Sequence, residues 1–194
     1  MCTKLISPSR AFWVDAFTGR VVIPNDNHFN QPNWNEWFSG VYGSTTALVP
    51  KTELQLYVLA DNASGDSPRV VRTAGRGNSP RDIYTIGARF QTLPGQLHGW
   101  DLNGEFAGQF GDFEYLSTVP GVVTGERLNH LAYATHLEGG YTFAKIDPKP
   151  RVAVGFDYGS GDNDPGDHDH QTFVNLFPTN HKFYGAMDFF SGKI

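Results

Sequence analysis

Cysteine, methionine and charged residues are all scarce in this sequence of 194 residues, which has one cysteine and two methionines. The single cysteine, Cys2, excludes an internal disulfide and a zinc site built from cysteines. Charged residues make up 18% of the chain, below the roughly 25% of soluble domains. The net charge of −5 is too small to indicate a nucleic-acid partner.

Long apolar segments are missing too, since no run approaches the roughly 20 residues of a transmembrane helix. No signal peptide is visible either. What the chain has instead is 22 glycines, 12 prolines and an aromatic content of 14%. Glycine and proline favour turns and aromatic residues favour strands, so we expect a single all-β domain.

The clearest strand signal is the alternation of apolar and polar side chains in residues 101–110. Leu102 and Phe106 share one face there, and Asp101 and Glu105 share the other. Comparable segments recur along the chain at about ten residues each, the length that a tilted membrane strand needs. The predicted strands are 11–23, 37–46, 53–60, 82–93, 101–110, 131–143 and 151–158, with a further strand near 183–190.

Residues 11–23 and 37–46 alternate less cleanly than the later segments. The positions of Asp15 and Arg20 on the two faces therefore stay undecided. A β-bulge, in which one strand carries an extra residue, would reconcile them.

The segments between the predicted strands alternate in length. Short turns lie near residues 50, 95 and 147, and long loops at 24–35, 61–80, 116–128 and 160–181. In an antiparallel up-and-down meander all long loops lie at one end, as in outer-membrane β-barrels. Aromatic residues recur near strand ends, where interfacial girdles would lie: Trp13, Trp37, Trp100, Tyr115 and Tyr158. Period-two alternation alone also fits a soluble β-sandwich.

The acidic loop and the aromatic segment after it carry the most specific motif in the chain. Its residues are Ser160 to Asp164, Asp167, Thr172-Phe173, Leu176 to Thr179, His181, Tyr184-Gly185 and Asp188. This order resembles the alginate-export family of bacterial outer-membrane β-barrels, and weaker similarity covers most of the remaining chain. The resemblance implies part of a transmembrane barrel, with outer-membrane lipid and an anionic polysaccharide or smaller anionic solute as partners. It implies a channel and no enzyme.

The polar faces of the predicted strands would line such a channel. The candidate pore-lining residues are Arg89, Gln91, Asn103, Glu105, Glu138 and Arg151. Arginine binds carboxylates through a two-pronged hydrogen-bonding fork. The family's selectivity is ascribed to a positively charged pore, which singles out the two arginines. The alternative is that both arginines pair with neighbouring carboxylates and only satisfy the barrel interior.

Two other kinds of chemistry fit the sequence less well. Asp101 and Glu105 could act as an acid/base pair in sugar hydrolysis, but their spacing on one strand separates them by roughly 13 Å. No cofactor is expected. Asp162, Asp164 and Asp167 offer oxygen ligands for calcium, but they lack the glycine and glutamate of an EF-hand loop.

The predicted loop at residues 61–80 is basic. Arg69, Arg72 and Arg76 are expected at a solvated loop tip, where they could gather anions at a channel mouth. The rival function is a soluble all-β carbohydrate-binding module that stacks Phe173, Phe177 and Tyr184 on sugars. The two hypotheses differ in whether Leu54, Phe106, Val154 and their neighbours form an exposed apolar belt or pack against a second sheet.

Residues 1–194 are expected to form one barrel segment of about seven to eight strands. A missing signal peptide in an exported protein indicates an internal fragment of a longer chain. Eight strands also enclose too narrow a space for a polymer. We therefore expect an open, curved sheet with two unpaired edge strands.

Overall fold

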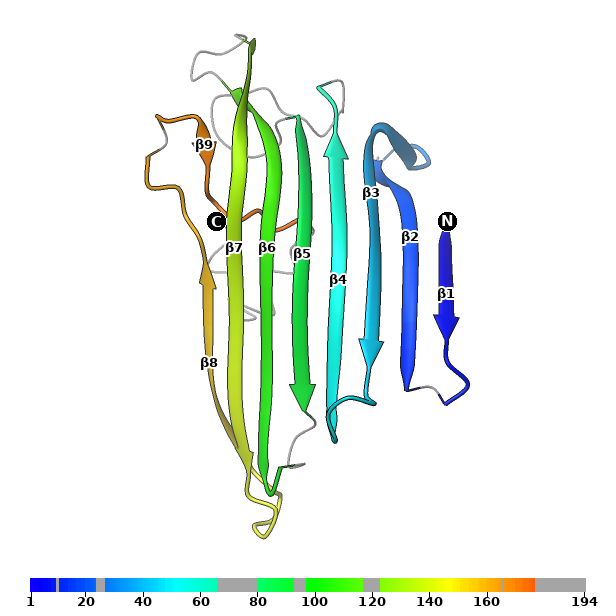
Figure 1. Cartoon of the computed structure of the whole chain (residues 1–194), viewed down its shortest axis with the longest axis vertical. Coiled ribbons are helices and arrows are strands. Elements are labelled where there is room, and N and C mark those ends of the chain that lie inside the picture. The colour runs from blue at the N-terminus through cyan, green and yellow to red at the C-terminus, as the bar shows by residue number, and fades with distance from the viewer. Residues whose placement is uncertain are drawn as a thin grey trace.

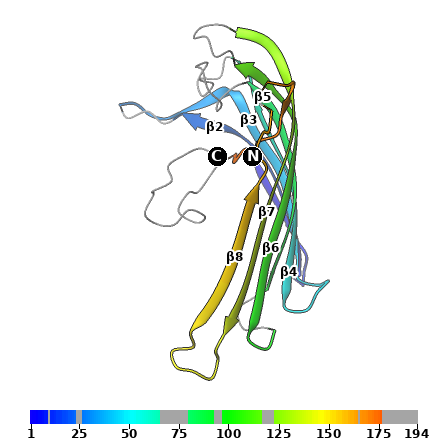
Figure 2. The same cartoon turned by 90° about the vertical axis from the view of Figure 1, so that its left-hand side faces the viewer.

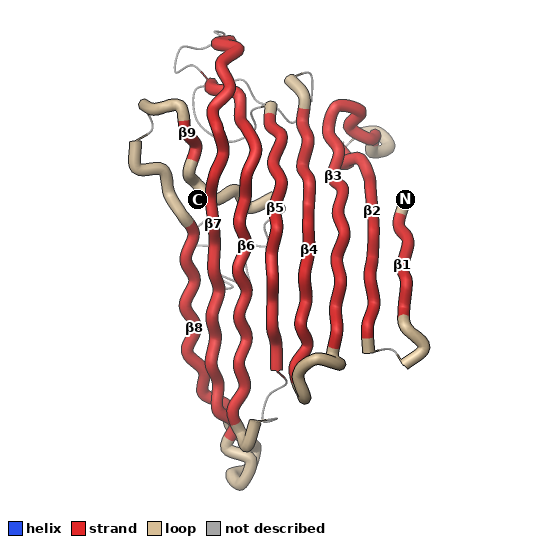
Figure 3. Tube along the Cα trace, in the orientation of Figure 1, coloured by secondary structure: helices blue, strands red, loops and turns tan. Residues whose placement is uncertain are grey.

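The computed structural model describes residues 1–9, 11–23, 27–65, 80–92, 97–116, 123–164 and 166–176, and within them the chain is all strand and loop (Figures 1 and 3). None of these residues form a helix long and apolar enough to cross a membrane. The strands are β1 (Cys2–Ile6), β2 (Phe12–Ile23), β3 (Gln31–Thr45), β4 (Thr52–Ala63), β5 (Arg81–Thr92), β6 (Trp100–Leu116), β7 (Val123–Thr142), β8 (Arg151–Gly159) and β9 (Asp169–His170).

The strands form one antiparallel meander in which each strand from β1 to β8 pairs with the next one in the chain. The short strand β9 returns to pair in parallel with β7, at Asn129 and His130. The described strands do not close into a ring, and β1 and β8 lie at opposite edges. Figure 2 shows the sheet curved about a concave side. The predicted open, curved sheet is confirmed.

Most predicted strands are confirmed, but several of their ends were wrong. β3 begins at Gln31 and β7 at Val123, so parts of two predicted long loops are strand. The prediction missed β1 and β9, because strands this short show too little alternation. The predicted strand near 183–190 lies outside the described residues.

The connections nonetheless sort to the two ends of the sheet as predicted. Strands β2, β4, β6 and β8 finish at one end of the sheet, which is called the long-loop end below (Figure 1). Strands β1, β3, β5 and β7 finish at the other end. This is the geometry of an up-and-down meander, because each antiparallel strand reverses the direction of the one before.

The pairing of β2 with β3 settles the positions of Asp15 and Arg20, and the bulge expected to reconcile them does not lie between them. The pairing is regular from Phe12 to Arg20, and the bulge follows only beyond Arg20, where residues 33–36 of β3 lie opposite Val21. Asp15 pairs with Tyr42 and Arg20 with Trp37, so the two side chains lie on opposite faces. Beyond the bulge, the tip of the β2–β3 hairpin bends toward the concave side (Figure 2).

One face of the sheet carries a continuous belt of exposed apolar side chains. Leu56 is 67% exposed, Phe106 53%, Leu131 72% and Val154 77%, and Leu54 beside them is half-buried. No second sheet covers these side chains within the described part of the chain. The predicted belt is confirmed, and an apolar surface of this size on a single sheet is typical of contact with lipid.

Candidate pore lining

The concave face of the sheet carries the polar side chains. Gln109 projects from the polar face of β6 and exchanges two hydrogen bonds of 2.8 Å with the backbone of Val174. The segment that contains Val174 runs from β9 past β7 and β6 on the concave side (Figures 1 and 2). The polar face is therefore the inner face of the curve, where a barrel has its lumen.

A stack of side chains crosses this inner face from β1 to β4. Lys4 lies 4.3 Å above the Trp13 ring and forms an ion pair of 3.0 Å with Asp15. Trp13 stacks on Tyr42 at 5.7 Å between ring centroids, and Tyr42 stacks on Tyr57 at 5.4 Å. Trp13 was predicted to lie in an interfacial girdle, and this was wrong, because its position on β2 puts it on the polar face beside Asp15.

The stack ends in a cluster around Glu105. The Tyr57 hydroxyl donates a hydrogen bond of 2.6 Å to Glu105, and Arg89 lies 4.0 Å from the same carboxylate. Arg89 also donates to Asn103 at 3.3 Å and to Gln91 at 2.9 Å. Four of the six candidate residues thus form one cluster, with Arg89 bound on several sides and only partly exposed.

Arg151 forms a second cluster nearer the short turns. It binds Asp101 through two hydrogen bonds of 3.0 and 2.6 Å, the fork geometry of arginine and carboxylate. It also donates to Glu138 at 2.7 Å. Glu138 pairs with Asn103 in the sheet, so the two clusters are neighbours on the wall.

Among the residues that the structure describes, acidic side chains outnumber basic ones on this wall. Both candidate arginines contact carboxylates. This agrees with the alternative interpretation, in which the arginines pair with neighbouring carboxylates and only satisfy the barrel interior. The basic residues on the described part of the inner face are Lys4, Arg81, Arg89 and Arg151. The acidic residues there include Asp15, Glu36, Glu53, Asp61, Asp101, Glu105, Glu138 and Asp157.

A buried ionic cluster lies near the long-loop end of the wall. Arg81 contacts Asp61 at 2.8 Å and Glu36 at 3.4 Å, and Asn33 donates to Glu36 at 2.9 Å. Asp61 and Glu36 are fully buried, and Arg81 is 5% exposed. The cluster ties the base of the bent β2–β3 hairpin to β4 and β5. Sequence reasoning missed it, because its members come from strands far apart in the chain.

Residues 160–176 fold back onto the inner face. The Ser160 hydroxyl donates to the carbonyl of Gln171 at 2.7 Å and accepts from the backbone N–H of Tyr133 at 2.9 Å. His170 stacks on Phe113 at 4.4 Å between centroids and contacts His130 at 3.0 Å. Ser160, His170 and Val174 thus attach the described part of the motif segment to the wall.

The acidic part of this segment is organised by turns. Asp162, Asp164 and Asp167 each accept a hydrogen bond from the backbone N–H two residues further on. Among the residues that the structure describes, no group of three or more His, Cys, Asp or Glu side chains could hold a metal ion. Phe177, Tyr184 and the basic residues Arg69, Arg72 and Arg76 lie outside the described part.

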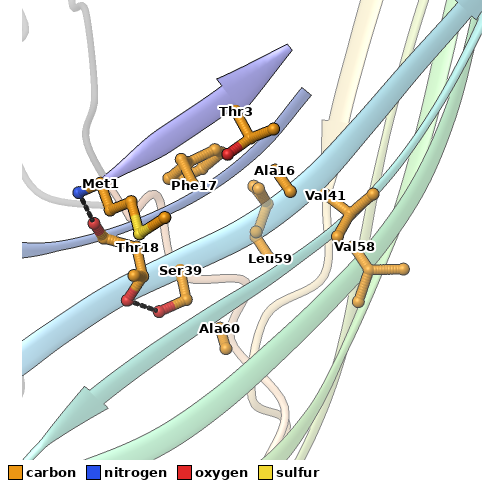
Figure 4. A pocket seen from close by; sticks show the side chains of 11 residues that line it. Met1, Thr3, Ala16, Phe17, Thr18, Ser39, Val41, Val58, Leu59 and Ala60 are labelled. Atoms are coloured by element: carbon orange, nitrogen blue, oxygen red, sulfur yellow. Dashed lines mark hydrogen bonds between the residues drawn. The ribbon is translucent and has the colours of Figure 1, made fainter. Parts of the chain in front are cut away.

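The other face carries a shallow apolar groove near the N-terminal edge. The hydroxyl groups of Thr18 and Ser39 form a hydrogen bond of 2.7 Å in this groove (Figure 4). Apolar side chains that also line it are Ala16, Val58 and Ala60. These side chains share the face of the exposed belt, so the groove points away from the lumen.

Comparison with known proteins agrees with this geometry. No curated protein and no solved structure matches the chain. The model of one protein family, described as alginate export, matches residues 3–192, nearly the whole sequence. Together with the open antiparallel sheet, which is apolar outside and polar inside, this match shows that the chain belongs to the alginate export family.

Proposed function

We propose that residues 1–194 form one wall segment of an outer-membrane channel that passes an anionic polysaccharide such as alginate, or smaller anionic solutes. The observation that carries the proposal is the division of one uncovered sheet into an exposed apolar face and a polar concave face. In lipid only a closed barrel satisfies the backbone groups of its edge strands. Strands outside the described sheet therefore complete the barrel.

Because Arg89 and Arg151 are paired with wall carboxylates, they suit the passage of an anionic solute better than its retention. A passing carboxylate can take the place of Glu105 beside Arg89, or of Glu138 beside Arg151, because each arginine has further donors. The displaced wall carboxylate then competes for the arginine and releases the solute. Conduction requires binding that is strong enough for entry and weak enough for exit.

The same contacts support a channel over a glycan-hydrolysing enzyme. Asp101 is bound in the fork of Arg151, and Glu105 accepts from Tyr57 and lies beside Arg89. Both carboxylates therefore serve ion pairs of the wall, and each belongs to a different cluster.

Ion selectivity in planar bilayers tests the proposal. In the complete protein, Arg89→Glu is expected to reduce the preference for anions, because it reverses one charge on the lumen wall. Glu105→Gln is expected to raise the preference, because it frees Arg89 while the amide oxygen still accepts from Tyr57. If both variants keep the selectivity of the unmodified channel, the arginines only satisfy the wall and the proposed role of Arg89 is wrong.

A further inference from the structure

Arg20 lies on the face of the sheet that carries the exposed apolar belt. Side chains alternate along β2, so Arg20 shares this outer face with Ala16 and Thr18, whereas Asp15 belongs to the inner wall. Arg20 pairs with Trp37 of β3, and it is the last residue of β2 before the bulge interrupts the pairing. Both side chains therefore leave the sheet on the side away from the lumen.

The outer face changes from apolar to polar at the level of Arg20. The cross-strand register places one row of residues there: Arg20, Trp37, Asn62, Asp82, Asp112 and Asn129. The next row of this face, nearer the short turns, consists of Thr18, Ser39, Ala60, Tyr84, Phe110 and Leu131. Tyr84, Phe110 and Leu131 are exposed members of the belt. The belt thus ends between these two rows, and Arg20 stands just beyond its edge.

On a sheet whose belt contacts lipid, this boundary lies at the level of the lipid headgroups. Tryptophan is enriched at that level in membrane proteins, and arginine side chains place their charge there. The long-loop end of an outer-membrane barrel faces the outside, so Arg20 would meet the outer leaflet. This placement rests on the proposed contact of the belt with lipid and not on what the channel passes.

Two tryptophans hold the Arg20 guanidinium. Its central carbon lies 4.4 Å from the centroid of the Trp34 ring and 3.8 Å from that of Trp37. One guanidinium nitrogen donates to the carbonyl of Trp34. These contacts orient the guanidinium and leave most of its five N–H groups for another acceptor. Trp34 is 69% exposed and Trp37 42%, so both rings offer apolar surface beside the fixed cation.

The charge of Arg20 is not neutralised by a described neighbour. Arg127, on the same face at the same end of the sheet, forms ion pairs with both Asp82 and Asp112. Asn62 lies between Trp37 and Asp82 in the row and donates to Asp82 at 2.7 Å. Arg20 contacts no carboxylate within the described part of the chain. The β2 end of the row therefore carries a net positive charge, which is complementary to an anion.

We propose that Arg20, Trp34 and Trp37 bind the phosphate of an anionic lipid headgroup in the outer leaflet. Phosphate oxygens accept the remaining N–H groups of Arg20, whose planar fork suits two-pronged binding of phosphate. The tryptophan rings pack on the apolar part of the lipid next to the phosphate, because such rings are apolar in body and polar at one end. The acyl chains then extend along the belt toward the short turns.

Native mass spectrometry of the complete protein, released from dodecylmaltoside micelles, tests the site. The probes are phosphatidylglycerol and a diacylglycerol with the same acyl chains, which has no phosphate. The unmodified protein is expected to retain phosphatidylglycerol in preference to the diacylglycerol. Arg20→Gln is expected to weaken binding of phosphatidylglycerol about tenfold, the loss expected for a charged hydrogen bond. Trp34→Ala is expected to weaken it about threefold, because one cation–π contact is lost.

Arg127→Gln is the matched control. It also removes one positive charge from the outer face at the long-loop end, but Arg127 already has two carboxylate partners. We expect this variant to bind phosphatidylglycerol like the unmodified protein. Equal binding by Arg20→Gln and the unmodified protein, or equal retention of the diacylglycerol, would overturn the proposal. Displacement of phosphatidylglycerol by inorganic phosphate at equal concentration would also overturn it and would indicate a site for free phosphate.

Conductance of the same variants in planar bilayers separates this site from the channel function and shows which variants assemble. Conducting channels whose lipid binding is indifferent to Arg20 would remove the site and leave the channel. Lipid binding that depends on Arg20 in a protein without conductance would support the site and remove the channel. If Arg20→Gln does not assemble, Trp34→Ala decides, because this exposed side chain contributes little to folding. Unchanged binding of phosphatidylglycerol by Trp34→Ala would then overturn the proposal.

Discussion

The ring of Tyr57 lies directly against the backbone of Gly87 on the neighbouring strand, in space that a Cβ atom at residue 87 would occupy. Tyr57 can reach Glu105 two strands away because glycine leaves this space open. The stack that begins at Lys4 on β1 thereby continues to the polar cluster on β6. Contact between the two residues makes the inner wall a connected surface rather than a set of separate cross-strand pairs.

Gly87→Ala is therefore expected to destabilise the sheet by about 1–3 kcal/mol, the usual cost of overpacking. The measurement is urea unfolding in lipid vesicles, followed by tryptophan fluorescence. Gly108→Ala is the control, because a Cβ atom there meets nothing within 4 Å. Equal stability of the two variants would show that Tyr57 moves aside without cost.

Arg81→Met is expected to destabilise the protein by about 3–5 kcal/mol, because it removes the cation that contacts the buried carboxylates of Asp61 and Glu36. Arg127→Met serves for comparison. The Arg127 side chain is 42% exposed, so the loss of its ion pairs should cost about 0–1 kcal/mol. Urea unfolding of both variants gives the two values, and a small effect at Arg81 would contradict the buried cluster.

Gln109→Leu is expected to release residues 171–176 from the inner wall. The side chain of Gln109 binds both the N–H and the carbonyl of Val174, and leucine leaves both groups without partners, at about 1–3 kcal/mol each. Faster amide hydrogen exchange in this segment and a larger single-channel conductance should follow. Gln109→Glu keeps the acceptor for the Val174 N–H and should give a smaller effect. Unchanged amide hydrogen exchange in Gln109→Leu would mean that the contacts of His170 are enough to hold this segment on the inner wall.

Ile86→Lys tests whether the exposed belt faces lipid. Ile86 is 56% exposed, so a lysine there would cost little in water. At the middle of a bilayer it should cost about 2–4 kcal/mol. Asn129→Lys lies on the same face at the long-loop end and should cost about 0–1 kcal/mol. Similar stabilities of the two variants in vesicles would contradict a lipid-facing belt.

Local sequence pattern was sufficient for the strands that alternate clearly and for the faces of their side chains. Side chains alternate along a strand with period two, so the facing of Phe106 and Glu105 could be read from their neighbours alone. The same alternation predicted the exposed belt and the polar candidate residues, and the motif beginning at Ser160 indicated the family. Short strands such as β1 carry too few residues for this signal, which is why they were missed.

The partners of the polar residues depended on the tertiary structure. Arg151 binds Asp101, 50 positions away in the chain, and Gln109 binds Val174, 65 positions away. The register of β3, β4 and β5 likewise brings Glu36 to Arg81, because both residues lie opposite Ala63. Strand register and chain reversal create these contacts, and neither is encoded in the period-two pattern of a single strand. Alternation along a strand determines which face a side chain occupies, but only the paired sheet determines what it meets there.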